Sequence, residues 1–160
     1  MTRSIMLLKE KPYRPRMADY RIGVFFTGRE QLGEGAKTTA PVYYANRWDI
    51  QPSDTAAYLR GEKVKPTKQI VFYIDNTFPE KWKPYLREGV TQWNELFEQI
   101  GFKDVVAAKD FPTDDPEFDP DNIKYSCVRY APSSIENAMG PSWVDPRSGE
   151  ILNASVYLYH

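Results

Sequence analysis

The sequence contains very little cysteine and histidine, the residues from which disulfides and many metal sites are built. Its 160 residues include one cysteine, Cys127, and one histidine, His160. A single cysteine excludes an internal disulfide, so the chain is not a disulfide-stapled small domain. A single histidine excludes a H-E-x-x-H zinc motif, which needs two imidazoles on one helix face. We interpret His160 as a histidine without a metal and Cys127 as a small residue inside a strand.

An excess of one charge and a long hydrophobic run are also missing. The chain has 21 basic and 22 acidic side chains, for a net charge of −1. This balance gives no field that would attract nucleic acid or an anionic membrane surface. No apolar run approaches the length of a membrane span, and the first residues lack the apolar core of a signal peptide. We therefore expect no nucleic-acid partner and no membrane span.

The best-defined pattern lies between residues 68 and 109. Residues 69–74 are almost continuously apolar, which is typical of a strand covered on both faces. Thr77 and Glu80 match a capping box and predict a helix over 79–100. Residues 103–109 predict a second strand, so the unit is β-α-β with parallel strands. The helix stripe predicted to be buried on the sheet contains Trp82, Leu86, Val90, Trp93 and Phe97.

The remaining segments add further strands around this unit. A strand is predicted at 125–130, and an extended piece follows at 138–144. The Asp-Pro-Arg-Ser-Gly sequence of residues 145–149 predicts a tight turn, and a last strand follows it at 151–159. Near the N-terminus, 20–27 and 41–50 predict either a hairpin or two strands of a small sheet, joined by a Gly-rich loop at residues 28–39. A connector is expected at 51–67. The fold class is α/β (α+β), with a β-rich segment at 1–67 and a second region at 68–160.

Two motifs have competing interpretations. The loop TDDPEFDPDN places carboxylates at every second position: Asp115, Glu117, Asp119 and Asp121. Such spacing resembles a calcium loop, but the turning glycine of an EF-hand is absent, so a solvated acidic loop is the alternative that we prefer. Asn153-Ala154-Ser155 fits a glycosylation sequon, although it falls inside the last predicted strand. Phosphate loops, serine nucleophile elbows and dinucleotide-binding fingerprints are absent from the sequence.

Several longer motifs in a fixed order carry a family resemblance. They are P-E-K-W-x-P-Y, the Trp-Asn pair of the helix, I-E-N-A-M-G-P-S and D-P-R-S-G-E-I-L-N-A. In this order they resemble the region before the zinc motif of large secreted bacterial zinc-dependent metalloproteases of the metzincin-like kind. The resemblance implies the upper part of a catalytic domain, with a twisted mixed sheet backed by helix 79–100.

The resemblance also carries functional expectations. In that family H-E-x-x-H-x-x-G-x-x-H follows and binds zinc. The resemblance therefore implies that this chain is a protease fragment, inactive alone, from a parent that is secreted or located in the periplasm or cell envelope. Its edge segment would bind a peptide or protein substrate as an added strand, through Ala138, Met139, Gly140, Pro141 and Ser142. The alternatives are a plain hairpin arm at this place, or a non-catalytic peptide-binding or structural module. Without the active-site helix, the sheet face opposite helix 79–100 is expected to be bare along the strand 151–159, so that the chain either self-associates or packs its N-terminal strands there.

Overall fold

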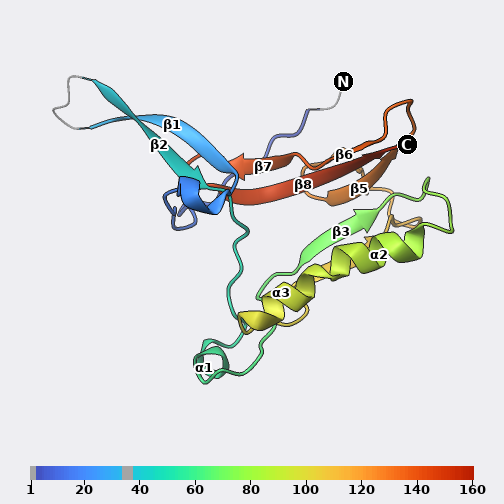
Figure 1. The fold of residues 1–160 in the computed structure, drawn as a ribbon, viewed down its shortest axis with the longest axis horizontal. Helices are drawn as coiled ribbons and strands as arrows, with labels where there is room; N and C mark the ends of the chain where they lie inside the picture. The colour runs from blue at the N-terminus through green and yellow to red at the C-terminus, as the bar shows by residue number, and fades with distance from the viewer. Residues whose placement is uncertain (1–2, 34–37) are drawn as a thin grey trace. The chain divides into compact units, whose positions relative to one another are not determined.

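The computed structural model describes residues 3–33 and 38–160, and Figure 1 shows its elements. The chain divides into two compact units. Unit 1 contains residues 3–49 and 142–153, and unit 2 contains residues 50–141 and 154–160. In chain order the elements are the 3₁₀ helix η1 (Tyr20–Ile22), β1 (Phe26–Leu32), β2 (Thr39–Ala45), α1 (Thr55–Leu59), β3 (Ile70–Ile74), α2 (Lys83–Thr91), α3 (Trp93–Gln99), β4 (Val106–Asp110), β5 (Ser126–Ala131), β6 (Asn137–Met139), β7 (Ser142–Asp145) and β8 (Glu150–Tyr159).

A six-stranded mixed sheet carries most of the fold and confirms the predicted α/β class. Its strand order is β4-β3-β5-β8-β6, and β7 also pairs with β8. β3 pairs in parallel with β4 and β5, and β5 pairs in parallel with β8. β6 is antiparallel to β8 and forms one edge. The predicted β-α-β unit is therefore confirmed, with β3 and β4 as its parallel strands and the helices between them.

The helix begins later than the predicted residue 79 and ends at Gln99. Pro84 lies in its first turn, where a missing N–H costs no hydrogen bond, so the helix starts beside the proline. At Gln92 a turn separates α2 from α3. Gly101 follows the end with φ +88°, a conformation that glycine adopts without strain.

The predicted capping box does not form. Asp75 Oδ1 accepts from the Thr77 backbone N–H at 2.9 Å and from its hydroxyl at 2.8 Å, so Thr77 closes a turn after β3. The Glu80 carboxylate instead accepts from Lys83 Nζ at 2.6 Å. The Asp75 side chain accepts from the Thr77 hydroxyl and backbone N–H, so Thr77 is engaged in this turn and does not cap the helix.

The core of unit 2 lies between the helices and one face of the sheet. Ile74, Phe78 and Val128 are almost fully buried at its centre. Half-buried apolar side chains from helices and strands surround them: Phe72, Trp82, Leu86, Val90, Ala108, Tyr130, Val156 and Leu158. The Phe78 and Tyr130 rings lie 5.1 Å apart, and the Trp82 ring meets Tyr130 edge-on at 5.9 Å.

Trp93 is not buried, so this part of the predicted stripe is wrong. Its side chain is 60% exposed, whereas Val90 and Phe97 are half-buried. Asn94 takes the position that faces the sheet. Its amide donates to Val106 O and accepts from Val106 N, both at 2.8 Å. Trp93 is one step of about 100° away on the helix surface. It therefore points to a different side of α3.

Over β3 and the start of β5, the acidic loop covers the sheet face opposite the helices. Phe118 lies at the middle of the acidic loop and contacts the rings of Tyr73, Phe111 and Tyr125 at centroid distances of 4.7–5.2 Å. No β8 residue is fully exposed. The loop of residues 111–125 therefore acts as a lid over β3 and β5, anchored by its aromatic side chains.

Unit 1 contains the predicted hairpin with different bounds. β1 and β2 pair antiparallel from Phe26↔Ala45 to Leu32↔Thr39. The predicted strand at 20–27 is replaced at its start by η1, because Asp19 caps this turn and Gly23 adopts φ +58°. The hairpin loop is shorter than predicted since β1 continues through Gly28 to Leu32, and residues 34–37 of that loop lie outside the described residues.

The Asp-Pro-Arg-Ser-Gly turn is confirmed, and in unit 1 its Asp145 and Ser148 are buried. Asp145 O accepts from Ser148 N at 3.1 Å and from Gly149 N at 2.8 Å. Gly149 has φ +74°, and a Cβ there would lie 2.5 Å from Ala45 O. Only glycine fits this turn, since both the backbone conformation and the close approach of β2 exclude a side chain.

Charged side chains tie the N-terminal arm to this turn. Lys9 Nζ donates to Glu150 at 2.8 Å and to Asp49 at 2.9 Å. Arg147 donates to the backbone O of Lys9 at 2.8 Å and to Asp145 Oδ2 at 2.7 Å. Asp145 is 1% exposed, and the Arg147 guanidinium holds the pKa of its carboxyl below the usual value.

The exchange of roles between Trp93 and Asn94 gives a stability prediction. Asn94→Ala should lower the free energy of unfolding by about 1–3 kcal/mol, because Val106 loses both hydrogen bonds at the start of β4. Trp93→Ala should cost less than about 1 kcal/mol, because its side chain is mostly in water. Urea unfolding of the two variants tests the order. A larger loss for Trp93→Ala would contradict this assignment of the helix faces.

Asp145 gives a pH-dependent prediction. Because its folded pKa is lowered, the ionised carboxylate stabilises the fold above its unfolded pKa of about 3.9, and this stability is lost as pH falls through the lower folded value. Asp145→Asn should cost about 2 kcal/mol near pH 7, and the difference from the unaltered chain should shrink below about pH 4. Chemical unfolding at several pH values measures it. A difference that stays constant down to about pH 2 would rule out the ion pair as the cause.

Candidate functional site

The edge strand β6 contains the first part of the predicted substrate segment. Ala138 and Met139 pair with Leu158 and Tyr157 of β8, and all three β6 residues are exposed. Gly140 and Pro141 continue from β6 and are exposed as well. Ser142, the fifth predicted residue, begins β7 and belongs to unit 1. The candidate site is therefore the open edge formed by residues 137–141 of unit 2.

Hydrogen bonds define which backbone groups of this edge face outward. Pro141 O accepts from Ser155 N of β8 at 3.0 Å, so Pro141 faces the sheet. Ala138 N donates to the side-chain Oδ1 of Asn137 at 2.8 Å and not to β8. Because alternate residues of an antiparallel strand face opposite edges, Ala138 and Gly140 present their backbone groups away from the sheet. These two residues are the ones that an added strand would meet.

Small side chains leave the open edge accessible. A Cβ at Gly140 would meet only Val156 Cγ2, at 3.8 Å, so the packing of the sheet does not require glycine here. Absence of a side chain instead suits close approach by another backbone. The side chain of Met139 is exposed and shares a sheet face with Tyr157, its cross-strand partner. The edge thus combines backbone donors and acceptors with one flexible apolar side chain.

Asn137 is the site residue that sequence analysis missed. Its amide oxygen occupies the outward N–H of Ala138, so a peptide carbonyl must displace it before pairing there. The sequence offered one signal, since an Asn or Asp side chain commonly accepts from a nearby backbone N–H. At an unpaired strand edge, such a hydrogen bond occupies a backbone N–H that another strand could otherwise use.

The other candidate residues have structural partners instead of chemical roles. Burial raises the pKa of the Cys127 thiol to about 12, so the thiol stays protonated and unreactive at neutral pH. The His160 ring meets Trp82 edge-on at 5.0 Å. Asn153 is 2% exposed, so the sequon is inaccessible to a glycan in the folded chain.

The acidic loop uses its carboxylates to shape the backbone. Asp115 Oδ1 accepts from Glu117 N at 2.9 Å, and Asp119 Oδ1 accepts from Asp121 N at 2.8 Å. Asp121 also forms an ion pair with Arg129 of β5. These bonds hold the loop over the sheet and account for the carboxylates at every second position.

The side chains present do not fit a zinc ion. Across residues 3–33 and 38–160, no three His, Cys, Asp or Glu side chains converge as metal ligands. A catalytic zinc needs three such ligands and one open position. The described residues therefore offer no ligand set for a catalytic zinc ion. In the same residues no helix is both long and apolar enough to span a membrane.

A metal-loading experiment tests this conclusion. The chain, stripped with chelator and then incubated with zinc, should retain much less than one zinc per chain after desalting, and it should cleave no unfolded protein substrate. Metal analysis by mass spectrometry and a casein digestion assay measure the two results. One retained zinc per chain, or proteolysis that a chelator stops, would contradict the absence of a ligand set.

Comparison with known proteins gives one partial match. A family model described as a domain of unknown function, DUF5117, matches residues 1–53. No metalloprotease family model matches the chain. No curated protein and no solved structure matches it. Part of the chain, its first 53 residues, is therefore similar to a family whose function is not described.

Proposed function

We propose that this chain is the peptide-binding part of a zinc-dependent metallopeptidase and that β6 receives the substrate as an added strand. The observation that carries the proposal is the open edge at residues 137–141, where Ala138 and Gly140 face away from β8. Backbone pairing at a sheet edge binds extended peptides with little dependence on their sequence. The peptidase assignment itself is supported by the ordered motifs that resemble the region before the zinc motif of such enzymes.

The role of these residues is binding and alignment, and no hydrolytic step involves them. An extended peptide lying antiparallel or parallel to β6 would donate to and accept from the outward groups of Ala138 and Gly140. Met139 would contact a substrate side chain on its own face of the sheet. A zinc ion held by other residues of such an enzyme would supply the Lewis-acid chemistry for hydrolysis.

A second candidate function is a peptide-binding module that does not cleave its ligand. The same edge supports it, and the lack of a zinc ligand set among the described residues favours it for this chain in isolation. The two functions share the binding step and differ only in whether the bound peptide is then cleaved. Binding measurements on the chain test the shared step, and proteolysis by the full-length parent separates the two functions.

Substitutions at Ala138 test the binding edge. Ala138→Pro removes the outward N–H, and its ring takes the place of the hydrogen and holds off a peptide carbonyl. The ladder to β8 should persist, because this N–H does not pair with β8. We expect extended peptides to bind at least about tenfold more weakly, a change of about 1.4 kcal/mol. Ala138→Val keeps the N–H and is the matched control, with affinity close to that of the unaltered chain.

Asn137→Ala provides a change in the opposite direction. It removes the amide that competes with the peptide, so affinity should rise by a few fold. NMR titration with a library of unstructured peptides reads out all three variants through the backbone amide signals of residues 137, 139 and 140, because Pro141 has no N–H and Ala138→Pro removes the one at residue 138. Equal affinities for Ala138→Pro and Ala138→Val, or peptide-induced shifts confined to other strands, would refute this edge as the binding site.

A further inference from the structure

The helices carry an apolar face that nothing in unit 2 covers. We call it the outer helix face; it consists of Tyr85, Gly89, Trp93, Leu96 and Ile100. The steps between these residues are four, four, three and four, the spacing of one helix face. Its four large side chains are exposed, Tyr85 by 74% and Leu96 by 54%. Scattered exposed apolar residues are normal, but a contiguous apolar row marks an interaction surface.

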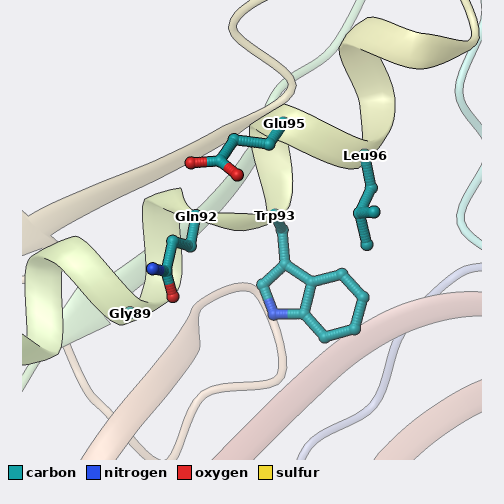
Figure 2. Close-up of a pocket in the computed structure, with 5 residues that line it drawn as sticks. All are labelled: Gly89, Gln92, Trp93, Glu95 and Leu96. Atoms are coloured by element: carbon teal, nitrogen blue, oxygen red, sulfur yellow. The ribbon is translucent and has the colours of Figure 1, made fainter.

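A shallow hollow lies on this face. Its volume is about 340 Å³, and it is lined by Gly89, Gln92, Trp93, Glu95 and Leu96. Figure 2 shows the side chains of Trp93 and Leu96 projecting side by side from α3, with Glu95 leaving the helix in another direction. The hollow therefore has an apolar wall of two side chains and a carboxylate at its border.

Gly89 has no explanation within the fold. It lies inside α2, where glycine costs about 1 kcal/mol relative to alanine. A Cβ at this position would meet nothing within 4 Å, so packing within the described chain does not exclude a side chain. The distance between two packed helices depends on the side chains at the contact, and glycine gives the closest approach. An approaching helix would use the space that Gly89 leaves.

Acidic and amide side chains border the outer helix face on its solvent side. Glu88, Gln92 and Glu95 form this border at steps of four and three. In the described part of the chain, no hydrogen bond or ion pair engages the Glu88 or Glu95 carboxylate. By contrast, Glu98 on another side of α3 is paired with Lys63 at 2.6 Å. The border therefore carries two exposed carboxylates that form no ion pair with another described residue.

We propose that the outer helix face docks an amphipathic helix of a partner protein, with an apolar face against Trp93 and Leu96 and Lys or Arg side chains against Glu88 and Glu95. The apolar row supplies the contact area, Gly89 permits close approach, and the unpaired carboxylates select a basic partner. A second copy of this chain fits less well. In a two-fold antiparallel pairing the acidic borders of both copies lie on the same side and repel each other.

Two synthetic peptides test the proposal. One is a fluorescently labelled helical peptide with Leu at three- and four-residue steps and Lys along both flanks of the Leu row; the other has Glu in place of every Lys. Fluorescence anisotropy at low salt should show the Lys peptide binding at least about tenfold more tightly than the Glu peptide. Equal affinity for both peptides would overturn the proposed charge selection.

Charge reversal locates the contact. Glu88→Lys combined with Glu95→Lys should reverse the preference between the two peptides. Asp114→Lys combined with Glu117→Lys changes the net charge by the same amount in the exposed acidic loop and is the matched control, which should keep the original preference. A reversal in the control, or no reversal at Glu88 and Glu95, would overturn the assignment to the outer helix face.

Gly89→Leu tests the approach of the partner without loss of the fold. Leucine favours the helix, so the thermal midpoint should stay unchanged or rise, whereas binding of the Lys peptide should fall at least about tenfold.

Sedimentation of the unaltered chain tests whether a second copy of the chain occupies the outer helix face instead. A dimer that Trp93→Asp dissociates would overturn the proposal in favour of a second copy. The test is independent of the β6 edge, so Ala138→Pro should leave this binding intact.

Discussion

The pairing of β8 on both of its sides is the constraint on which the candidate binding edge depends. β6 is three residues long, and among the described strands it pairs with β8 alone, through Asn137↔Tyr159 to Met139↔Tyr157. On its other side β8 pairs with β5 from Cys127↔Ser155 to Ala131↔Tyr159. An isolated short strand has no stability of its own, so the register of β8 against β5 decides where β6 lies. That register in turn rests on Val156 and Leu158, which pack with the core around Ile74 and Val128.

The helices show how one element can have two apolar faces with different partners. The face made by Leu86 and Val90 packs on the sheet, and Asn94 extends this contact by bonding to Val106. The adjoining face, with Trp93 and Leu96, is in water. A helix that is apolar over so wide an arc has more apolar surface than one sheet covers. The excess surface is the physical reason to expect a further contact in the assembled protein.

Sequence patterns predicted the elements better than they predicted their contacts. The apolar run at 70–74, the glycine after the helix and the Asp145–Gly149 turn are local signals, and each formed where it was expected. The burial of Trp93 was predicted wrongly, because periodicity identifies an apolar arc but not which part of it meets the sheet. Phe118 was overlooked within an acidic loop, since its role depends on Tyr73 and Tyr125, whose positions beside it arise only from the sheet pairing. The roles of Asn137 and Ala138 at the open edge could not be predicted either, because which backbone groups face outward depends on the pairing of β6 with β8.

The amide of Asn137 has a consequence for the behaviour of the chain at high concentration. A free strand edge is a template on which other chains can build intermolecular sheet, and such growth leads to aggregates. If the edge receives peptides as proposed, it cannot be covered permanently by another strand or by a proline. A side chain that occupies the outward N–H of Ala138 and yields to a better acceptor offers a reversible solution. Under the proposed function, Asn137 would thus limit aggregation through this edge while no peptide is bound, and it would lower the affinity for each peptide.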